Sequence, residues 1–125
     1  RAQQRVDGGN DPGMKVSELS PCPATKESFR RAQMRFVSEK SGCYVLATFD
    51  EDILYVGLAS NLRRRFGQHL DTPEKVTATT NGRATWFFWL ECKDLEKVER
   101  TWMNSYALRH GAWPVLNKVY SPTAV

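Results

Sequence analysis

The sequence predicts an α+β fold, with a small, mainly antiparallel three-stranded sheet flanked by helices. Two segments rich in strand-forming residues, 42–48 and 53–57, flank a short polar stretch, and an aromatic third segment follows at 85–92. Apolar side chains recur at helical spacing before, between and after these segments. The 125 residues suit one compact domain.

The composition excludes several classes of protein. A hydrophobic fraction of 41% argues against disorder of the whole chain. No apolar run approaches the ~18 residues of a membrane helix, and the polar first residues do not resemble a signal peptide. A net charge of +4 and a pI of about 9.1 favour an anionic partner. The three cysteines, Cys22, Cys43 and Cys92, lack metal-type spacing and indicate reduced thiols in a reducing compartment.

The chain divides into an arm and a domain. Residues 1–24 are rich in Gly, Pro, Asp and Ser and are predicted to form a flexible N-terminal arm or linker. Residues 25–120 are predicted to form the domain, beginning with a helix at 25–38 whose N-cap is Thr25. Four apolar residues mark the buried face of that helix: Phe29, Ala32, Phe36 and Val37.

The remaining elements follow in order. Segments 42–48 and 53–57 should pair as an antiparallel hairpin around the polar turn at 49–52. Ser60 should cap a helix at 61–70, followed by a loop at 71–84 and a buried strand at 85–92. Asp94 should cap a last helix that ends near Gly111, and residues 114–117 should lead into an extended tail.

Five side chains are candidates for chemistry. Tyr44 and Tyr55 belong to the two hairpin strands. Arg65 and His69 are four residues apart and therefore share a helix face. Glu99 falls at the edge of the inward face of the last helix, where a carboxylate needs a hydrogen bond, a cation or a metal.

Neighbouring charges have simpler interpretations. Glu96 lies in the first turn of the last helix, where negative charge favours the helix dipole, so we interpret it as structural. Arg63 and Arg64 point more toward solvent and form a basic surface suited to phosphates. Taken singly, a strand tyrosine, a helix arginine or a glutamate at a core edge is more often structural than functional. Composition and spacing alone therefore indicate a basic α+β domain and leave nucleic-acid binding open.

Together these residues resemble the GIY-YIG nuclease family over about residues 41–118. The first signature reads Gly42-Cys43-Tyr44 and the second reads Tyr55-Val56-Gly57. The helix after the hairpin then carries the family's arginine at Arg65 and its Tyr-or-His position at His69. The family's later glutamate and asparagine fall on Glu99 and Asn117.

The sequence departs from the family pattern in four places. Cys43 replaces the usual aliphatic residue, and Leu58 stands where many members carry lysine, so one phosphate contact is missing. The stretch from Glu99 to Pro114 is longer than in short members of the family. The N-terminal segment has no counterpart in the family core.

The resemblance implies a metal-dependent endonuclease that hydrolyses DNA phosphodiester bonds with one Mg²⁺ or Mn²⁺. Glu99 would hold the ion, and Tyr44 would be the general base once a nearby cation lowers its pKa. Tyr55 would hydrogen-bond the phosphate or the water, and His69 would assist proton movement or position the phosphate. Arg65 would neutralise phosphoryl charge. Three arginines are expected to bind DNA and two residues to support the site: Arg63, Arg64 and Arg65, then Gly57 and Asn117.

Two alternatives remain at this point. One is a non-catalytic nucleic-acid-binding module on the same fold, and the other is a protein-interaction domain whose aromatic residues only fill a core. The expected partner is DNA, with no membrane, and a homodimer or a separate targeting domain or subunit is left open. An intracellular, reducing location is expected, and roles in repair, restriction or mobile elements are not distinguished.

Overall fold

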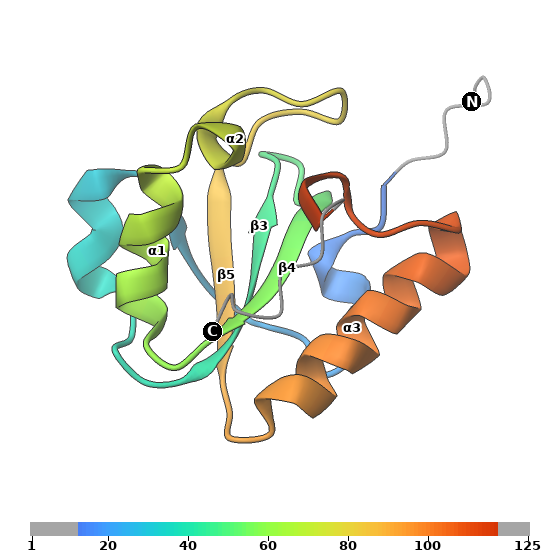
Figure 1. The fold of residues 1–125 in the computed structure, drawn as a ribbon, viewed down its shortest axis with the longest axis horizontal. Coiled ribbons are helices and arrows are strands. Elements are labelled where there is room, and N and C mark those ends of the chain that lie inside the picture. Colours follow the sequence, from blue (N-terminus) through green and yellow to red (C-terminus); the bar gives the residue numbers. More distant parts are fainter. Residues whose placement is uncertain (1–12, 118–125) are drawn as a thin grey trace.

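The computed structural model describes residues 13–117 and confirms the α+β class (Figure 1). Its centre is an antiparallel sheet of four strands in the order β2-β5-β3-β4. The predicted number of three strands is wrong, because a strand near the N-terminus was not expected. The strands are β2 (Thr25–Ser28), β3 (Gly42–Ala47), β4 (Ile53–Ala59) and β5 (Trp86–Glu91).

The predicted hairpin is confirmed. β3 and β4 pair antiparallel, with Tyr44 opposite Gly57 and Leu46 opposite Tyr55. The polar turn between them includes Glu51, whose φ of 70° lies in the left-handed region. Strand β4 forms one edge of the sheet, so the side chains and backbone groups around it are reached from outside the sheet.

The prediction of a helix at residues 25–38 is wrong. Residues Thr25–Ser28 form β2 along the free edge of β5, and residues Arg31–Phe36 form the short 3-10 helix η2. The proposed N-cap Thr25 is instead paired with Trp89. The aromatic strand β5 needs a partner on this edge, and that requirement overrides the local helical pattern. Phe36, expected on a buried face, is 52% exposed.

Helices cover the two faces of the sheet (Figure 1). Alternate residues of β3 point to opposite faces, so Cys43 joins one hydrophobic cluster and Tyr44 joins the other. Helix α3 (Leu95–His110) packs on the Cys43 face. Helix α1 (Leu62–Leu70) and η2 pack on the Tyr44 face, which is the face that carries the candidate site.

The ends of the two long helices differ in how well they were predicted. Asn61, and not Ser60, is the N-cap of α1, because the Asn61 side chain accepts a hydrogen bond from the Arg64 backbone. Asp94 occupies the N-cap position of α3 as predicted, although its side chain makes no capping hydrogen bond. Gly111 ends α3 with a φ of 74°, the left-handed stop expected of a glycine.

Segments predicted to lack structure contain short helices. The predicted loop at 71–84 includes helix α2 (Pro73–Val76), and the segment expected to lead into an extended tail forms the 3-10 helix η3 (Val115–Asn117). Proline at the start of α2 favours a helical turn there. Both short helices supply side chains to the candidate site.

Part of the segment expected as a flexible arm is packed against the domain. Met14, Val16 and Leu19 are buried in the cluster beneath α3, and η1 (Val16–Glu18) lies among them. The Trp102 indole also donates a hydrogen bond to the Pro21 carbonyl. Burial of these apolar side chains explains why the segment is held from Met14 onward. Residues 1–12 of the expected arm, and residues 118–120 of the expected domain, lie outside the described residues.

Two further findings concern membranes and thiols. Between residues 13 and 117 no helix is both long and apolar enough to cross a bilayer. Cys22, Cys43 and Cys92 all carry free thiols.

Candidate active site

At the centre of the site, the ring of Tyr44 packs against Gly57 of the neighbouring strand. Tyr44 on β3 is directly opposite Gly57 on β4, and a Cβ built on Gly57 would stand 2.5 Å from Cζ and Oη of Tyr44. The missing side chain of Gly57 therefore lets the phenol cross β4. The Tyr44 ring also stacks on Phe87 of β5, with ring centroids 5.0 Å apart. These contacts hold the ring on both sides, and the side chain is fully buried.

The Tyr44 hydroxyl meets a histidine from α1. Tyr44 Oη and His69 Nε2 are 2.5 Å apart and share a hydrogen bond. Burial, followed by the positive charges of Lys75 and Arg65, lowers the pKa of His69 from 6.5 to about 3. A neutral imidazole can accept a proton on Nε2 when its other nitrogen carries the hydrogen. In this structure the imidazole is therefore neutral and can accept the hydrogen bond of the Tyr44 hydroxyl.

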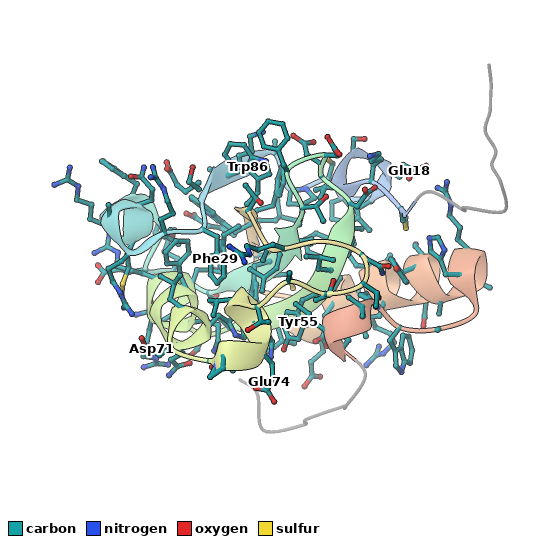
Figure 2. All side chains as sticks on the ribbon, turned by 90° about the horizontal axis from the view of Figure 1, so that it is seen from above. Glu18, Phe29, Tyr55, Asp71, Glu74 and Trp86 are labelled. Atoms are coloured by element: carbon teal, nitrogen blue, oxygen red, sulfur yellow. The ribbon has the colours of Figure 1, made fainter. Side chains whose placement is uncertain are left out.

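Tyr55 on β4 completes an aromatic group around this hydrogen bond. Its ring centroid lies 6.0 Å from that of Tyr44 and 5.2 Å from that of His69. Tyr55 keeps part of its surface exposed, whereas Tyr44 has none. Figure 2 shows Tyr55 beside the helical turn that carries Glu74. Tyr55 is therefore the phenol of the pair that a bound molecule meets first.

Burial sets the ionisation of both phenols. It raises the pKa of Tyr44 well above 10, with a further increase from Tyr55 and an opposing effect of the Arg65 charge. It also raises the pKa of Tyr55, while a hydrogen bond from Tyr44 and the Arg65 charge act in the opposite direction. Both phenols are therefore protonated at neutral pH in this structure.

Arg65 lies on the same face of α1 as His69, as their spacing predicts. Both side chains are buried, with 9% and 7% of their surface exposed. The Arg65 charge lowers the pKa of Tyr44, Tyr55 and His69. In the two phenols it opposes the larger effect of burial, and in His69 it adds to that effect. The structure thus brings together four of the five predicted catalytic residues: Tyr44, Tyr55, Arg65 and His69.

Glu99, the fifth predicted residue, approaches from α3 on the other face of the sheet. Its charge raises the pKa of Tyr55, which places it near the edge strand β4. The carboxylate is half-buried, and burial raises its pKa, followed by the negative charge of Glu96. Glu99 therefore stands close enough to Tyr55 for its charge to act on that phenol.

The donor set bears on metal binding. Among the described residues no three His, Cys, Asp or Glu side chains are grouped as a metal site. Glu99 is a half-buried carboxylate whose partial desolvation favours a cation partner. Mg²⁺ keeps several waters and is commonly held by one or two carboxylates together with substrate phosphates. The residues present therefore fit an ion that is held partly by Glu99 and partly by the oxygens of a bound phosphate. The described residues do not form a closed cage of protein ligands.

Asn117 contacts the backbone of the edge strand. Its Oδ1 accepts from the Val56 N–H at 2.8 Å, and its Nδ2 donates to the Val56 carbonyl at 2.9 Å. The side-chain amide thus replaces a neighbouring strand at the residue between Tyr55 and Gly57. This position suits the supporting role that was expected for Asn117.

The three arginines expected to bind DNA have different surroundings. Arg63 donates to the carbonyls of Val37 and Arg35 and lies 3.4 Å from a Glu39 carboxylate oxygen. Those contacts hold α1 to the end of η2 and favour a structural role. Arg64 is exposed and donates to Ser60 Oγ, so its charge is presented to solvent. Arg65 belongs to the buried group described above.

Sequence reasoning missed one member of the site. Lys75 on α2 places its ammonium 4.7 Å from the centroid of the Tyr55 ring. It lies in a polar segment read as a loop, and no spacing rule connects it to the hairpin. A signal was available only in the proline and charged residues of 73–75, which suit the start of a helix.

Comparisons with known proteins agree with this arrangement. The model of the GIY-YIG catalytic domain matches residues 40–109, more than half of the chain. UvrABC system protein C of Finegoldia magna is 37% identical over 46 residues. That match covers 37% of this chain and 8% of the relative, so the similarity concerns a small part of that longer protein. From the family match and from the grouping of its signature tyrosines, we conclude that the chain belongs to the GIY-YIG family of nucleases.

Proposed function

We propose that this protein is a metal-dependent endonuclease that hydrolyses DNA phosphodiester bonds. The observation that carries the proposal is the hydrogen bond between Tyr44 and His69, placed beside Tyr55 and Arg65. These residues come from β3, β4 and α1, and they converge on one face of the sheet. A group that combines a proton acceptor, two hydroxyls and a guanidinium suits hydrolysis of a phosphate ester.

In the proposed mechanism Tyr44 is the general base and acts together with His69. The phenol takes a proton from the attacking water on Oη and passes its own proton to His69 Nε2. This step avoids a free phenolate, and it requires that the bound phosphate anion offset the Lys75 and Arg65 charges and so raise the pKa of His69 from about 3. The new P–O bond forms from the water oxygen while the bond to the leaving oxygen breaks. Because Tyr44 is fully buried, substrate binding must open a path to its hydroxyl past Tyr55.

The other residues bind and orient. Arg65 neutralises charge on the phosphoryl oxygens, for which its planar fork is suited. Tyr55, the partly exposed phenol, hydrogen-bonds the phosphate or the attacking water. Glu99 would hold Mg²⁺ or Mn²⁺, and the bound cation supplies Lewis-acid stabilisation of the developing charge. Asn117 keeps β4 in place, and the exposed Arg64 contacts the DNA backbone outside the site.

The test is a cleavage assay with matched carboxylate variants. The full chain is incubated with supercoiled plasmid and with single-stranded and branched oligonucleotides, in Mg²⁺, in Mn²⁺ and in chelator. Glu99→Gln is compared with Glu96→Gln, which removes a charge from the first turn of the same helix. We expect metal-dependent nicking by the wild type and by Glu96→Gln, and none by Glu99→Gln. The Glu99 variant should retain its fold and its DNA affinity.

Two outcomes contradict parts of the proposal. DNA binding without cleavage under every condition favours the alternative, a non-catalytic nucleic-acid-binding module. Full activity of Glu99→Gln removes that residue from metal binding. The substrate that is cut best then distinguishes repair from restriction, and the relative's membership of the UvrABC system makes a repair substrate our first expectation.

The two tyrosines are separated by a second comparison. Tyr44→Phe removes the proposed base and should lower kcat with little change in DNA affinity. Tyr55→Phe removes a hydroxyl that contacts substrate, so KM should rise as well as kcat fall. An unchanged kcat in Tyr44→Phe, with a large loss in Tyr55→Phe, assigns the base role to Tyr55.

A further inference from the structure

Lys75 reaches the candidate active site from an element that none of the signature residues occupies. Helix α2 follows α1 closely, and Lys75 lies in its single turn. The ammonium stands 4.7 Å from the centroid of the Tyr55 ring, whose edge in turn meets the His69 ring. A lysine 20 residues beyond Tyr55 in sequence is thus held over the exposed phenol of the group.

The charge of Lys75 acts on His69. After burial, the Lys75 ammonium is the largest contribution that lowers the pKa of His69. Burial also lowers the pKa of Lys75 itself, and the Arg65 charge acts in the same direction. Two cations therefore stand beside a neutral imidazole and two protonated phenols. Their mutual repulsion is relieved when an anion binds between them.

In the part of the chain that the structure describes, no carboxylate forms a salt bridge with the Lys75 ammonium. Within residues 13–117 the Lys75 side chain makes no hydrogen bond and no salt bridge, and its contact is with the Tyr55 ring. Glu74, its neighbour in the chain, favours the charged form only through longer-range attraction. A half-buried ammonium without an ion-pair partner carries a desolvation cost that a bound anion offsets. The geometry therefore presents an available cation at the exposed side of the catalytic group.

We propose that the Lys75 ammonium binds a nonbridging oxygen of a DNA phosphate, at the side of the active site formed by Tyr55 and His69. The inference rests on the proposed nuclease function and adds a substrate contact to it. Arg65 then acts on the phosphate from α1 while Lys75 acts from α2. Two cations on different elements would fix the phosphate against Tyr55, which a single arginine does not achieve.

A structural role for Lys75 makes a different prediction. If Lys75 only packs its stem and ammonium on Tyr55, an apolar side chain of similar length should preserve the site. If Lys75 binds phosphate, the positive charge is essential and the exact shape of the side chain matters less. Lys75→Met and Lys75→Arg separate these roles, because methionine keeps the stem and arginine keeps the charge.

The experiment measures cleavage and binding with the full chain. kcat and KM are determined with a DNA oligonucleotide in Mg²⁺, and affinity is measured in chelator over a series of salt concentrations. Lys97→Met is the matched control, since Lys97 is an exposed lysine of α3. We expect Lys75→Met to lose roughly 10- to 100-fold in kcat/KM and to bind DNA with a shallower salt dependence. Lys75→Arg should recover much of the loss, and Lys97→Met should behave as the wild type.

The outcomes distinguish this inference from the proposed function. A wild type that cleaves, with Lys75→Met unchanged in kcat/KM and salt dependence, overturns the Lys75 assignment and leaves the nuclease intact. An equal loss in Lys75→Met and Lys75→Arg, accompanied by lower thermal stability, also overturns it in favour of packing. A wild type that neither binds nor cleaves DNA overturns the proposed function and the Lys75 contact together.

Discussion

The ring of Tyr44 occupies the space that a side chain on Gly57 would fill. A Cβ on Gly57 would stand 2.5 Å from both Cζ and Oη of Tyr44, closer than real Cβ contacts allow. Gly57 of the second signature is therefore required because the side chain of Tyr44, from the first signature, fills the space beside it. This contact also directs the Tyr44 hydroxyl toward His69 Nε2, 2.5 Å away.

Gly57→Ala should therefore disable the site through Tyr44. The added methyl displaces the phenol from His69, so we expect kcat to fall at least tenfold while DNA affinity changes little. Overpacking of this kind costs about 1–3 kcal/mol in the free energy of unfolding, measured by urea denaturation. Gly67→Ala is the control, because its Cβ meets the flexible ends of the Met34 and Arg31 side chains. Equal activity of Gly57→Ala and wild type would contradict the requirement for an empty position at Gly57.

The burial of His69 predicts a loss of stability in acid. Burial and the charges of Lys75 and Arg65 lower its pKa from 6.5 to about 3 in the folded chain. Between these two values the unfolded chain binds a proton that the folded chain does not. His69 therefore adds no pH dependence to the free energy of unfolding above pH 6.5, and it makes this free energy decrease as the pH falls from 6.5 toward 3.

The contribution of His69 can be isolated with a neutral replacement. At its steepest the effect amounts to about 1.4 kcal/mol per pH unit. Urea denaturation of the wild type and of His69→Gln at several pH values in this window measures it. We expect His69→Gln to be less stable than wild type at pH 7 but to lose less stability on acidification. Parallel pH dependences of the two proteins would mean that His69 takes up its proton as readily folded as unfolded.

The parts of the fold that follow from local patterns were predictable. The hairpin is specified by two short runs of strand formers around a polar turn, and the spacing of Arg65 and His69 places them on one helix face. Strand β2 was not predictable in this way, because Thr25–Ser28 contains mainly polar residues. Its conformation depends on pairing with β5, a partner distant in sequence.

The candidate site shows the same division. The tyrosines and α1 residues were found from the signatures, but their mutual contacts depend on how α1 packs on the sheet. Lys75 reaches Tyr55 only because the chain reverses after α1 and forms a single helical turn. Glu99 approaches from the opposite face, and helical spacing alone does not relate it to Tyr55. Contacts between distant elements are what local patterns leave undetermined.

Asn117 predicts a link between the edge of the sheet and the rate of cleavage. Asn117→Ala leaves the N–H and carbonyl of Val56 without this partner, which should lower the free energy of unfolding by about 1–3 kcal/mol. Because Val56 lies between Tyr55 and Gly57, kcat should fall too. Asn117→Asp retains an acceptor for the N–H but lacks the amide donor, so an intermediate stability is expected. Thermal unfolding and single-turnover cleavage test both statements, and an Asn117→Ala variant with wild-type stability would rule out the supporting role.

Arg63 and Arg64 are adjacent in sequence, yet their surroundings predict opposite phenotypes. Arg63 holds the Val37 and Arg35 carbonyls, so Arg63→Ala should lower stability by about 1–3 kcal/mol with little change in the salt dependence of DNA binding. Arg64 is exposed, so Arg64→Ala should preserve stability and weaken DNA binding, with a reduced dependence of affinity on salt. Urea denaturation and fluorescence anisotropy with labelled DNA measure the two quantities.

If Arg63→Ala instead weakens DNA binding without loss of stability, the Arg63 guanidinium of the wild type leaves η2 to contact DNA. If Arg64→Ala binds as tightly as wild type at low salt, the DNA backbone does not pass over this end of α1.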